Sequence, residues 1–169
     1  MKMIFGVFML LSLQTVEAKE LVLFKAKADY TVKHLFKTVK GESGQLKGKM
    51  LCEKEVCEFL VAIPAMSFVS SDSNRDLNMQ TILEVKKFPL ITVKGTFPES
   101  NLAKQNFEIK SLVSLHGIEK EYVLNINYGA TSSGRLNLLL EDHKVERPSL
   151  LMAKIDNKVP VSFSFEWKE

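Results

Sequence analysis

The sequence predicts an all-β protein: an antiparallel β-barrel of about eight strands with one short helix inserted near residues 76–87. Three observations support this fold class. Apolar and polar residues alternate along much of the chain, which is typical of strands with one buried face. Turn-forming residues separate the alternating segments. One stretch instead has the 3–4-residue apolar spacing of a helix.

The alternating segments define the faces that we expect to point inward. At the C-terminal end one face is apolar throughout and the other is nearly all polar. Ser111 and Leu112 are exceptions, because each lies on the face that its polarity does not suit. The predicted inward faces are Tyr30, Val32 and Phe36; Phe107, Ile109, Val113 and Leu115; Tyr122, Leu124, Ile126 and Tyr128; Leu136, Leu138 and Leu140; and Val159, Val161, Phe163, Phe165 and Trp167.

Three turn motifs punctuate the strands. The segment Gly41-Glu42-Ser43-Gly44 is expected to reverse the chain before Leu46. The segments His116–Glu119 and Gly129–Gly134 are each flanked by alternating runs, so each predicts a hairpin.

Cys52 and Cys57 are the two cysteines of the chain, separated by four residues. Four residues is a common hairpin loop length, so symmetric pairing would place the two cysteines opposite each other. The spacing does not match a C-x-x-C redox motif or a haem attachment motif. We therefore expect a disulfide between them that closes a small loop and stabilises the fold modestly.

Residues 76–87 form the predicted helix. Asn74 or Asp76 can cap its start, and Pro89 forces it to end at or before Phe88. A second irregular stretch covers residues 142–157, where Ser149–Met152 could form a helical turn. The apolar stripe of the helix comprises Met79, Ile82, Leu83 and Lys86.

Residues 1–18 have the pattern of a cleavable signal peptide, with Lys2 before an apolar run from Ile4 to Leu13 and small-residue cleavage after Ala18. The run of about ten residues is too short to cross a bilayer, which takes roughly twenty. We expect a single mature domain over residues 19–169, periplasmic or secreted, with no transmembrane segment.

Composition and motifs argue against several functions. The formal charge is +3 and the basic residues do not cluster, so nucleic-acid binding is not expected. The histidines His34, His116 and His143 are scattered and predict no metal site. No G-x-S-x-G, P-loop or dinucleotide-binding motif is present. The sequence thus predicts a protein that is not an enzyme and has no metal or catalytic cofactor.

Four segments in the same order resemble the YceI family, and together they cover most of the mature chain. The first runs from Tyr30 to Gly48, and the second from Ser67 to Met79, with Asn74-Arg75-Asp76 at its centre and Asn78 where the family has His. Lys87–Thr92 and Leu115–Lys120 complete the set. The resemblance implies a lipocalin-like barrel, often exported, with a polyisoprenoid chain in its apolar pore.

The resemblance supplies the expected ligand, an isoprenoid lipid of quinone or polyprenyl type. The residues alone favour a dry packed core over a cavity, and the resemblance reverses that preference. The alternative function is that of a non-enzymatic envelope interaction or stress protein with a packed barrel. Arg75 and Asp76 either contact a head group or cap the helix. Whether the protein forms a homodimer is left open. The expected cavity wall is Tyr30, Phe36, Phe107, Ile109, Val113, Tyr122, Leu124, Leu136, Phe163 and Phe165, and the expected mouth is Asn74, Arg75, Asp76 and Asn78.

Overall fold

The structure is a computed structural model that describes residues 18–34, 37–150 and 153–169. The predicted signal peptide therefore lies almost wholly outside the described residues. The strands are β1 (Lys19–His34), β2 (Lys37–Ser43), β3 (Lys47–Glu53), β4 (Val56–Pro64), β5 (Val69–Ser70), β6 (Leu90–Pro98), β7 (Asn106–Leu115), β8 (Ile118–Asn127), β9 (Ser132–Leu139), β10 (Ser149–Leu150), β11 (Ala153–Lys154) and β12 (Lys158–Lys168). The helices are α1 (Ser73–Ile82) and the 3₁₀ turns η1 (Ala65–Ser67), η2 (Glu99–Ala103) and η3 (Glu141–His143).

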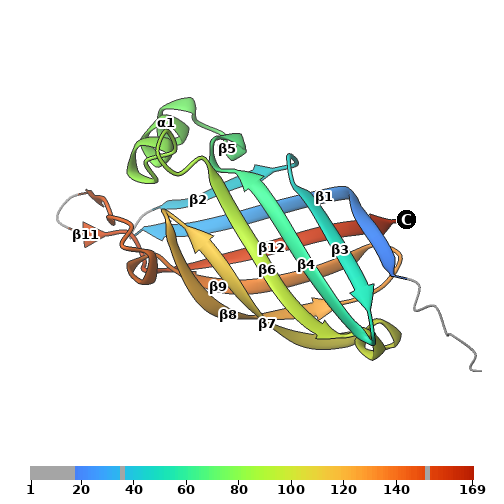
Figure 1. Cartoon of the computed structure of the whole chain (residues 1–169). Coiled ribbons are helices and arrows are strands. Elements are labelled where there is room, and N and C mark those ends of the chain that lie inside the picture. The colour runs from blue at the N-terminus through green and yellow to red at the C-terminus, as the bar shows by residue number, and fades with distance from the viewer. Residues whose placement is uncertain (1–17, 35–36, 151–152) are drawn as a thin grey trace, which may run out of the picture.

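The main sheet closes on itself to form the predicted barrel (Figure 1). Its eight wall strands follow the order β12-β9-β8-β7-β6-β4-β3-β1, and β12 pairs with β1 to complete the ring. All pairings are antiparallel. Closure removes the exposed edges that an open sheet would present. The expected fold class, with one inserted helix, is confirmed.

β2 and β3 together form one interrupted strand that runs beside β1. The pairs His34↔Lys37 in β2 and Lys19↔Cys52 in β3 belong to a single register. β2 is therefore already antiparallel to β1 when it begins at Lys37, and the reversal expected at Gly41–Gly44 is wrong. Gly41 to Ser43 belong to β2, and residues 44–46 only interrupt the strand, because β2 and β3 run in the same direction.

A second, smaller apolar cluster lies where β2 separates from the wall strand β4. β4 pairs with β3 and β6, whereas β2 pairs with β1 and β5. Ala28, Ile63 and Phe68 pack together between these elements, and each is less than a tenth exposed. α1 and β5 lie beside them at this end of the barrel (Figure 1). We call it the α1 end.

α1 begins three residues earlier than predicted and also ends earlier. Asp72 is the N-cap, because its carboxylate accepts hydrogen bonds from the backbone N–H groups of Asn74 and Arg75. Asp76, one of the two predicted caps, instead accepts a hydrogen bond from the N–H of Ser70 at 2.9 Å. After Ile82 the chain continues in turns, and Glu84 has a φ of 47°. The helix therefore ends well before Phe88, the last position that Pro89 allows.

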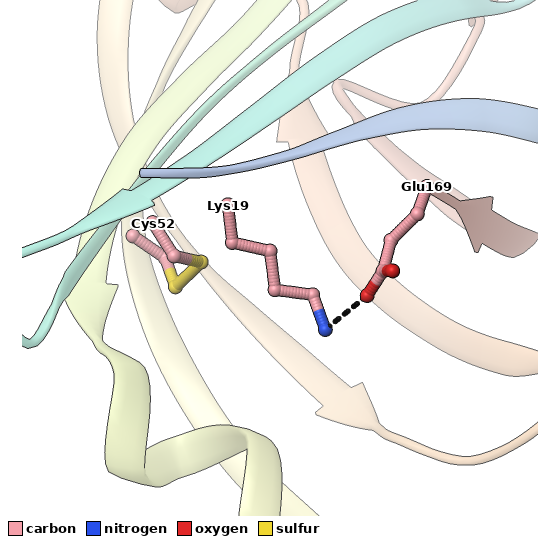
Figure 2. The surroundings of a disulfide bond; sticks show 4 residues. Lys19, Cys52 and Glu169 are labelled. Atoms are coloured by element: carbon pink, nitrogen blue, oxygen red, sulfur yellow. Dashed lines mark ion pairs between the residues drawn. A yellow bond between two sulfur atoms is a disulfide. The ribbon is translucent and has the colours of Figure 1, made fainter. Parts of the chain in front are cut away.

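The predicted hairpins and disulfide are present. Lys54 and Glu55, both with positive φ, join β3 to β4, so this turn has two residues and not the expected four, because Glu53 and Val56 already pair. His116 and Gly117 join β7 to β8 in the same way, and residues 128–131 join β8 to β9, so Ser132 to Gly134 of the third predicted turn belong to β9. Cys52 and Cys57 lie directly opposite each other with Cα atoms 4.0 Å apart and form the disulfide. Figure 2 shows this bond beside the ion pair between Lys19 and Glu169. We call this the disulfide end, opposite α1 in Figure 1.

The two remaining expectations had different outcomes. Ser111 is buried and Leu112 is 38% exposed, so the strand kept its alternation despite these two side chains. Ser149 and Leu150 form β10, which pairs with β11, and the helical turn expected there is wrong. Ser149 and Leu150 pair with Lys154 and Ala153, and the Ile155 N–H donates to the Pro148 carbonyl, so the backbone of the described residues is hydrogen-bonded between strands.

Candidate functional site

The interior of the barrel is hollow. A cavity of about 720 Å³ runs through it, within the range of about 300–1,000 Å³ that is usual for ligand pockets. Inward side chains of the wall strands line it, and Met79, Ile82 and Leu83 line it from α1 and the turn that follows. Three residues of the predicted stripe therefore face the cavity, whereas the fourth, Lys86, lies beyond α1 and is exposed.

The aromatic side chains of the wall show that these faces do not meet in a dry core. Phe107, Phe163 and Phe165 point inward, yet each remains partly accessible and borders the cavity. In a packed core they would be buried against one another. Phe163 instead stacks on Phe165 at 6.0 Å between ring centroids along one strand. The open alternative between core and cavity is thus resolved in favour of a cavity.

The two ends of the cavity differ in polarity. The charged side chains of its described lining are Arg75 and Glu146, both at the α1 end, where Asn78 and Thr81 add polar atoms. Near the disulfide end the lining is apolar and aromatic, with Phe97, Leu102, Phe107, Tyr128 and Trp167. The cavity can therefore take a long apolar chain whose polar group lies at the α1 end.

The predicted mouth residues divide into two pairs. Arg75 and Asn78 line the cavity. Asn74 and Asp76 do not line the cavity. Asn74 is exposed in the first turn of α1, and the Asp76 carboxylate accepts a hydrogen bond from the Ser70 N–H. The Nε of Arg75 lies 3.3 Å from Asp72, so part of its charge is already paired within the helix.

Most of the predicted wall residues lie around the cavity. Phe36 lies outside the described residues. Burial raises the pKa of the Tyr30 hydroxyl, and the nearby charge of Asp76 raises it further by a smaller amount. The raised pKa keeps the Tyr30 hydroxyl uncharged. The predicted residues that line the cavity are Tyr30, Phe107, Ile109, Val113, Leu124, Leu136, Phe163 and Phe165.

Tyr122 is the exception, because its side chain belongs to a polar cluster instead of the cavity lining. Its hydroxyl lies 3.1 Å from His143 Nε2 and accepts a hydrogen bond from the Leu139 N–H at 3.3 Å. β8 and β9 pair only over Asn125–Asn127, so Tyr122 takes up a backbone N–H that a longer ladder would have satisfied. The alternation that placed Tyr122 inward carried no signal for this role.

His143 is fully buried next to Tyr122, and the rings stack at 5.7 Å. Its Nδ1 donates to the Ile118 carbonyl at 2.9 Å, so Nε2 of the neutral ring is an acceptor that faces the Tyr122 hydroxyl. That hydroxyl has one proton for two acceptors, His143 Nε2 at 3.1 Å and Asp142 Oδ2 at 3.3 Å. Burial lowers the pKa of His143, so the neutral form is favoured. His116 donates from Nδ1 to the His143 carbonyl at 3.1 Å. Within the described residues, no group of three or more His, Cys, Asp or Glu side chains could hold a metal ion.

Comparison with known proteins identifies this architecture. The sequence profile of the YceI-like domain matches residues 16–167, nearly the whole chain. The chain belongs to the YceI-like family. No curated protein matches this YceI-like chain. None of the helices in the described ranges is long and apolar enough to cross a membrane.

Several solved structures share the fold of this YceI-like domain. A polyisoprenoid binding domain from Saccharophagus degradans is 16% identical with a TM-score of 0.69, covering 88% of this chain and 97% of its own. Burkholderia cenocepacia BcnA is 13% identical with a TM-score of 0.70, covering 85% and 96%. The Campylobacter jejuni YCEI protein is 16% identical with a TM-score of 0.62, covering 81% and 90%. At these identities the likeness establishes the fold.

Proposed function

We propose that this YceI-like domain is an exported, non-enzymatic carrier that holds the tail of an isoprenoid lipid, of quinone or polyprenyl type, inside its barrel. The observation that carries the proposal is the cavity of about 720 Å³ with an almost wholly apolar lining. Family membership supports the ligand class, since the similar Saccharophagus degradans domain is described as polyisoprenoid binding.

The physical basis is removal of the tail from water. Burial of an apolar chain contributes about 0.8 kcal/mol per CH₂ group, so a long tail binds tightly without directed polar contacts. Arg75 and Asn78 are then the side chains that meet the polar end of the lipid. Export is supported by the N-terminal pattern and by the disulfide, since disulfides persist mainly in oxidising compartments.

The test is organic extraction of the protein purified from its native host, followed by mass spectrometry. Co-purification of an isoprenoid lipid at a defined stoichiometry is the expected result. Repeated recovery without any isoprenoid would contradict the carrier and favour a protein-interaction role for the barrel. N-terminal sequencing of the same material should begin at Lys19 if residues 1–18 are removed.

Two neighbouring substitutions make the test specific for the cavity. Val113→Trp adds a ring at a position that lines the cavity, whereas Leu112→Trp adds the same ring at the adjacent, outward position. The inward variant should lose most of the extracted lipid and the outward variant should keep it. Thermal unfolding of both variants checks that each remains folded. Equal lipid content in the two folded variants would contradict binding in the cavity.

A further inference from the structure

The α1 end of the barrel carries a concentration of exposed apolar side chains. Met66 is 64% exposed, Val69 54%, Leu77 60% and Leu90 49%. They lie on η1, β5, α1 and the first residue of β6, within a stretch of 25 residues. The other large exposed hydrophobic residues described are spread over five wall strands: Val22, Phe24, Leu51, Val56, Leu60, Leu112 and Val123. Five of these, from Val22 to Leu60, lie on the neighbouring strands β1, β3 and β4, but the exposed charged residues Glu20, Lys49 and Glu58 alternate with them across the ladder. An apolar group without such interruption is the better mark of an interaction site.

Hydrogen bonds hold the four elements together as one surface. The N–H of Ala65, beside Met66, donates to the Pro89 carbonyl at 2.9 Å, and Leu90 pairs with Pro64. Ser70, beside Val69, donates to Asp76 of α1. Figure 1 shows α1 and β5 close together at this end. We call Met66, Val69, Leu77 and Leu90 the α1-end patch.

The patch adjoins the polar end of the cavity. α1 separates the two, with Met79 bordering the cavity and Leu77 exposed to solvent on the same helix. None of the residues of α1 is fully buried. A ligand tail that leaves the cavity past α1 would therefore emerge next to whatever covers the patch.

The charges beside the patch favour an anionic partner. Among the carboxylates of these elements, Asp72 pairs with Arg75, Asp76 accepts the Ser70 N–H, and Glu84 lies near Lys87 and His116. Glu42, opposite Val69 in the ladder, pairs with Lys27. In contrast, Lys37, Lys40 and Lys86 are exposed and form no ion pair with the described residues. Asp76 and Glu146 are the carboxylates beside the patch and in the cavity lining that form no ion pair with the described residues, against the three lysines, so the local surface presents apolar side chains with a small excess of positive charge.

We propose that the α1 end docks on the surface of a phospholipid membrane that contains anionic lipids. Met66, Val69, Leu77 and Leu90 enter the interface between head groups and acyl chains, and the neighbouring lysines contact the lipid phosphates. This inference rests on the proposed carrier function and extends it, since docking at the mouth lets a lipid tail move between membrane and cavity without crossing water. A bilayer is the occupant because it is the one partner that offers an apolar layer, an anionic surface and the cargo together.

Vesicle flotation tests the proposal with the full mature chain. Vesicles of phosphatidylcholine with phosphatidylglycerol should carry the protein, vesicles of phosphatidylcholine alone should carry less, and added salt should weaken binding. The triple variant Met66→Ser, Leu77→Ser, Leu90→Ser should bind about tenfold or more weakly, a loss of about 1.4 kcal/mol or more. The double variant Val56→Ser, Leu60→Ser, outside the patch, should bind like the unmodified protein.

The charge contribution has its own matched pair. Lys40→Glu with Lys86→Glu should reduce flotation with anionic vesicles, and Lys104→Glu with Lys168→Glu at the disulfide end should not. The single variant Leu77→Ser, at a well exposed position, keeps the test valid if the triple variant does not fold. Absence of vesicle binding by the unmodified protein, or equal binding by patch and control variants, would overturn the proposal.

A separate titration with a fluorescent isoprenoid in solution distinguishes the two proposals. Patch variants should bind the isoprenoid normally while losing vesicle binding, which supports docking. If the protein takes up the isoprenoid but does not float with vesicles, the docking proposal is wrong and the carrier proposal stands. Flotation without any isoprenoid uptake would support docking and contradict the carrier.

Discussion

Tyr122 and His143 show how a single polar pair completes the wall of the barrel. β8 and β9 separate beyond Asn125, and the Tyr122 hydroxyl satisfies both the Leu139 N–H and His143 Nε2. His143 in turn is held by the Ile118 carbonyl. A buried polar group without a partner costs free energy, so each member of this cluster depends on the others.

Tyr122→Phe should lower the free energy of unfolding by about 1–3 kcal/mol, because it leaves the Nε2 of buried His143 without a partner. Urea unfolding measures the change. Tyr128→Phe is the matched control, since the Tyr128 hydroxyl has no hydrogen-bond partner recorded among the described residues and lines the cavity. Equal stability of the two variants would show that the Tyr122 hydroxyl contributes nothing to the fold.

The buried imidazole of His143 also predicts a pH dependence. Its pKa is lowered in the folded state by burial, so the unfolded chain binds more protons as the solution becomes acidic. The stabilisation from this site is complete above the unfolded value of about 6.5 and is lost as the pH falls below it. Urea unfolding just above and below that pH should show the decrease. His143→Gln should show a smaller decrease, and an unchanged pH dependence in that variant would contradict the assignment.

At the scale of elements, α1 depends on one side chain for its start. Asp72 accepts hydrogen bonds from two backbone N–H groups in the first turn and also pairs with Arg75. An acidic N-cap also interacts favourably with the positive end of the helix dipole. The helix has no fully buried residue, so packing does little to replace this cap.

Asp72→Ala should therefore destabilise α1 by about 1 kcal/mol. Hydrogen exchange of the α1 amides should accelerate while exchange in the barrel strands stays the same. Ser71→Ala changes the exposed neighbouring residue and is the control. Equal acceleration throughout the protein would indicate global destabilisation and contradict a local role for the cap.

The elements that the sequence predicted well are those with a repeated pattern. The alternation from Val159 to Trp167 specified both β12 and the face that lines the cavity, because period-two spacing fixes which side chains point inward. The pairing of Cys52 with Cys57 followed from their being the two cysteines of the chain and from their symmetric placement about a short turn, although that turn has two residues and not four. The start of α1 was missed because Asp72, Asn74 and Asp76 are all good caps by residue type, and only three-dimensional contacts distinguish them. The reversal predicted at Gly41–Gly44 was wrong for a related reason, since glycine permits a turn without requiring one.

At the scale of the whole molecule, the sequence could not decide between a hollow and a packed barrel. Inward apolar alternation is the same in both cases, and the difference lies in how far apart the facing walls stand. The family resemblance anticipated the lipid-sized cavity, and the structure supplies its volume and its polar end. The role of Tyr122 had no sequence signal, because the splitting of β8 from β9 depends on long-range packing.

The limited volume of the apolar cavity predicts a dependence on tail length. Affinity should rise with each added isoprene unit, at about 0.8 kcal/mol per buried CH₂ as an upper guide, and then level off once the cavity of about 720 Å³ is full. Competition with a series of isoprenoid alcohols that differ in tail length measures this. Affinity that is independent of length would contradict burial of the tail.

The ion pair between Lys19 and Glu169 has a practical consequence for handling this protein (Figure 2). It lies beside the disulfide, so Glu169 emerges on the side of the molecule away from α1. A reporter or surface linker attached there leaves the opening unobstructed. Immobilised through that residue, every copy would present its entrance to the solution in the same orientation.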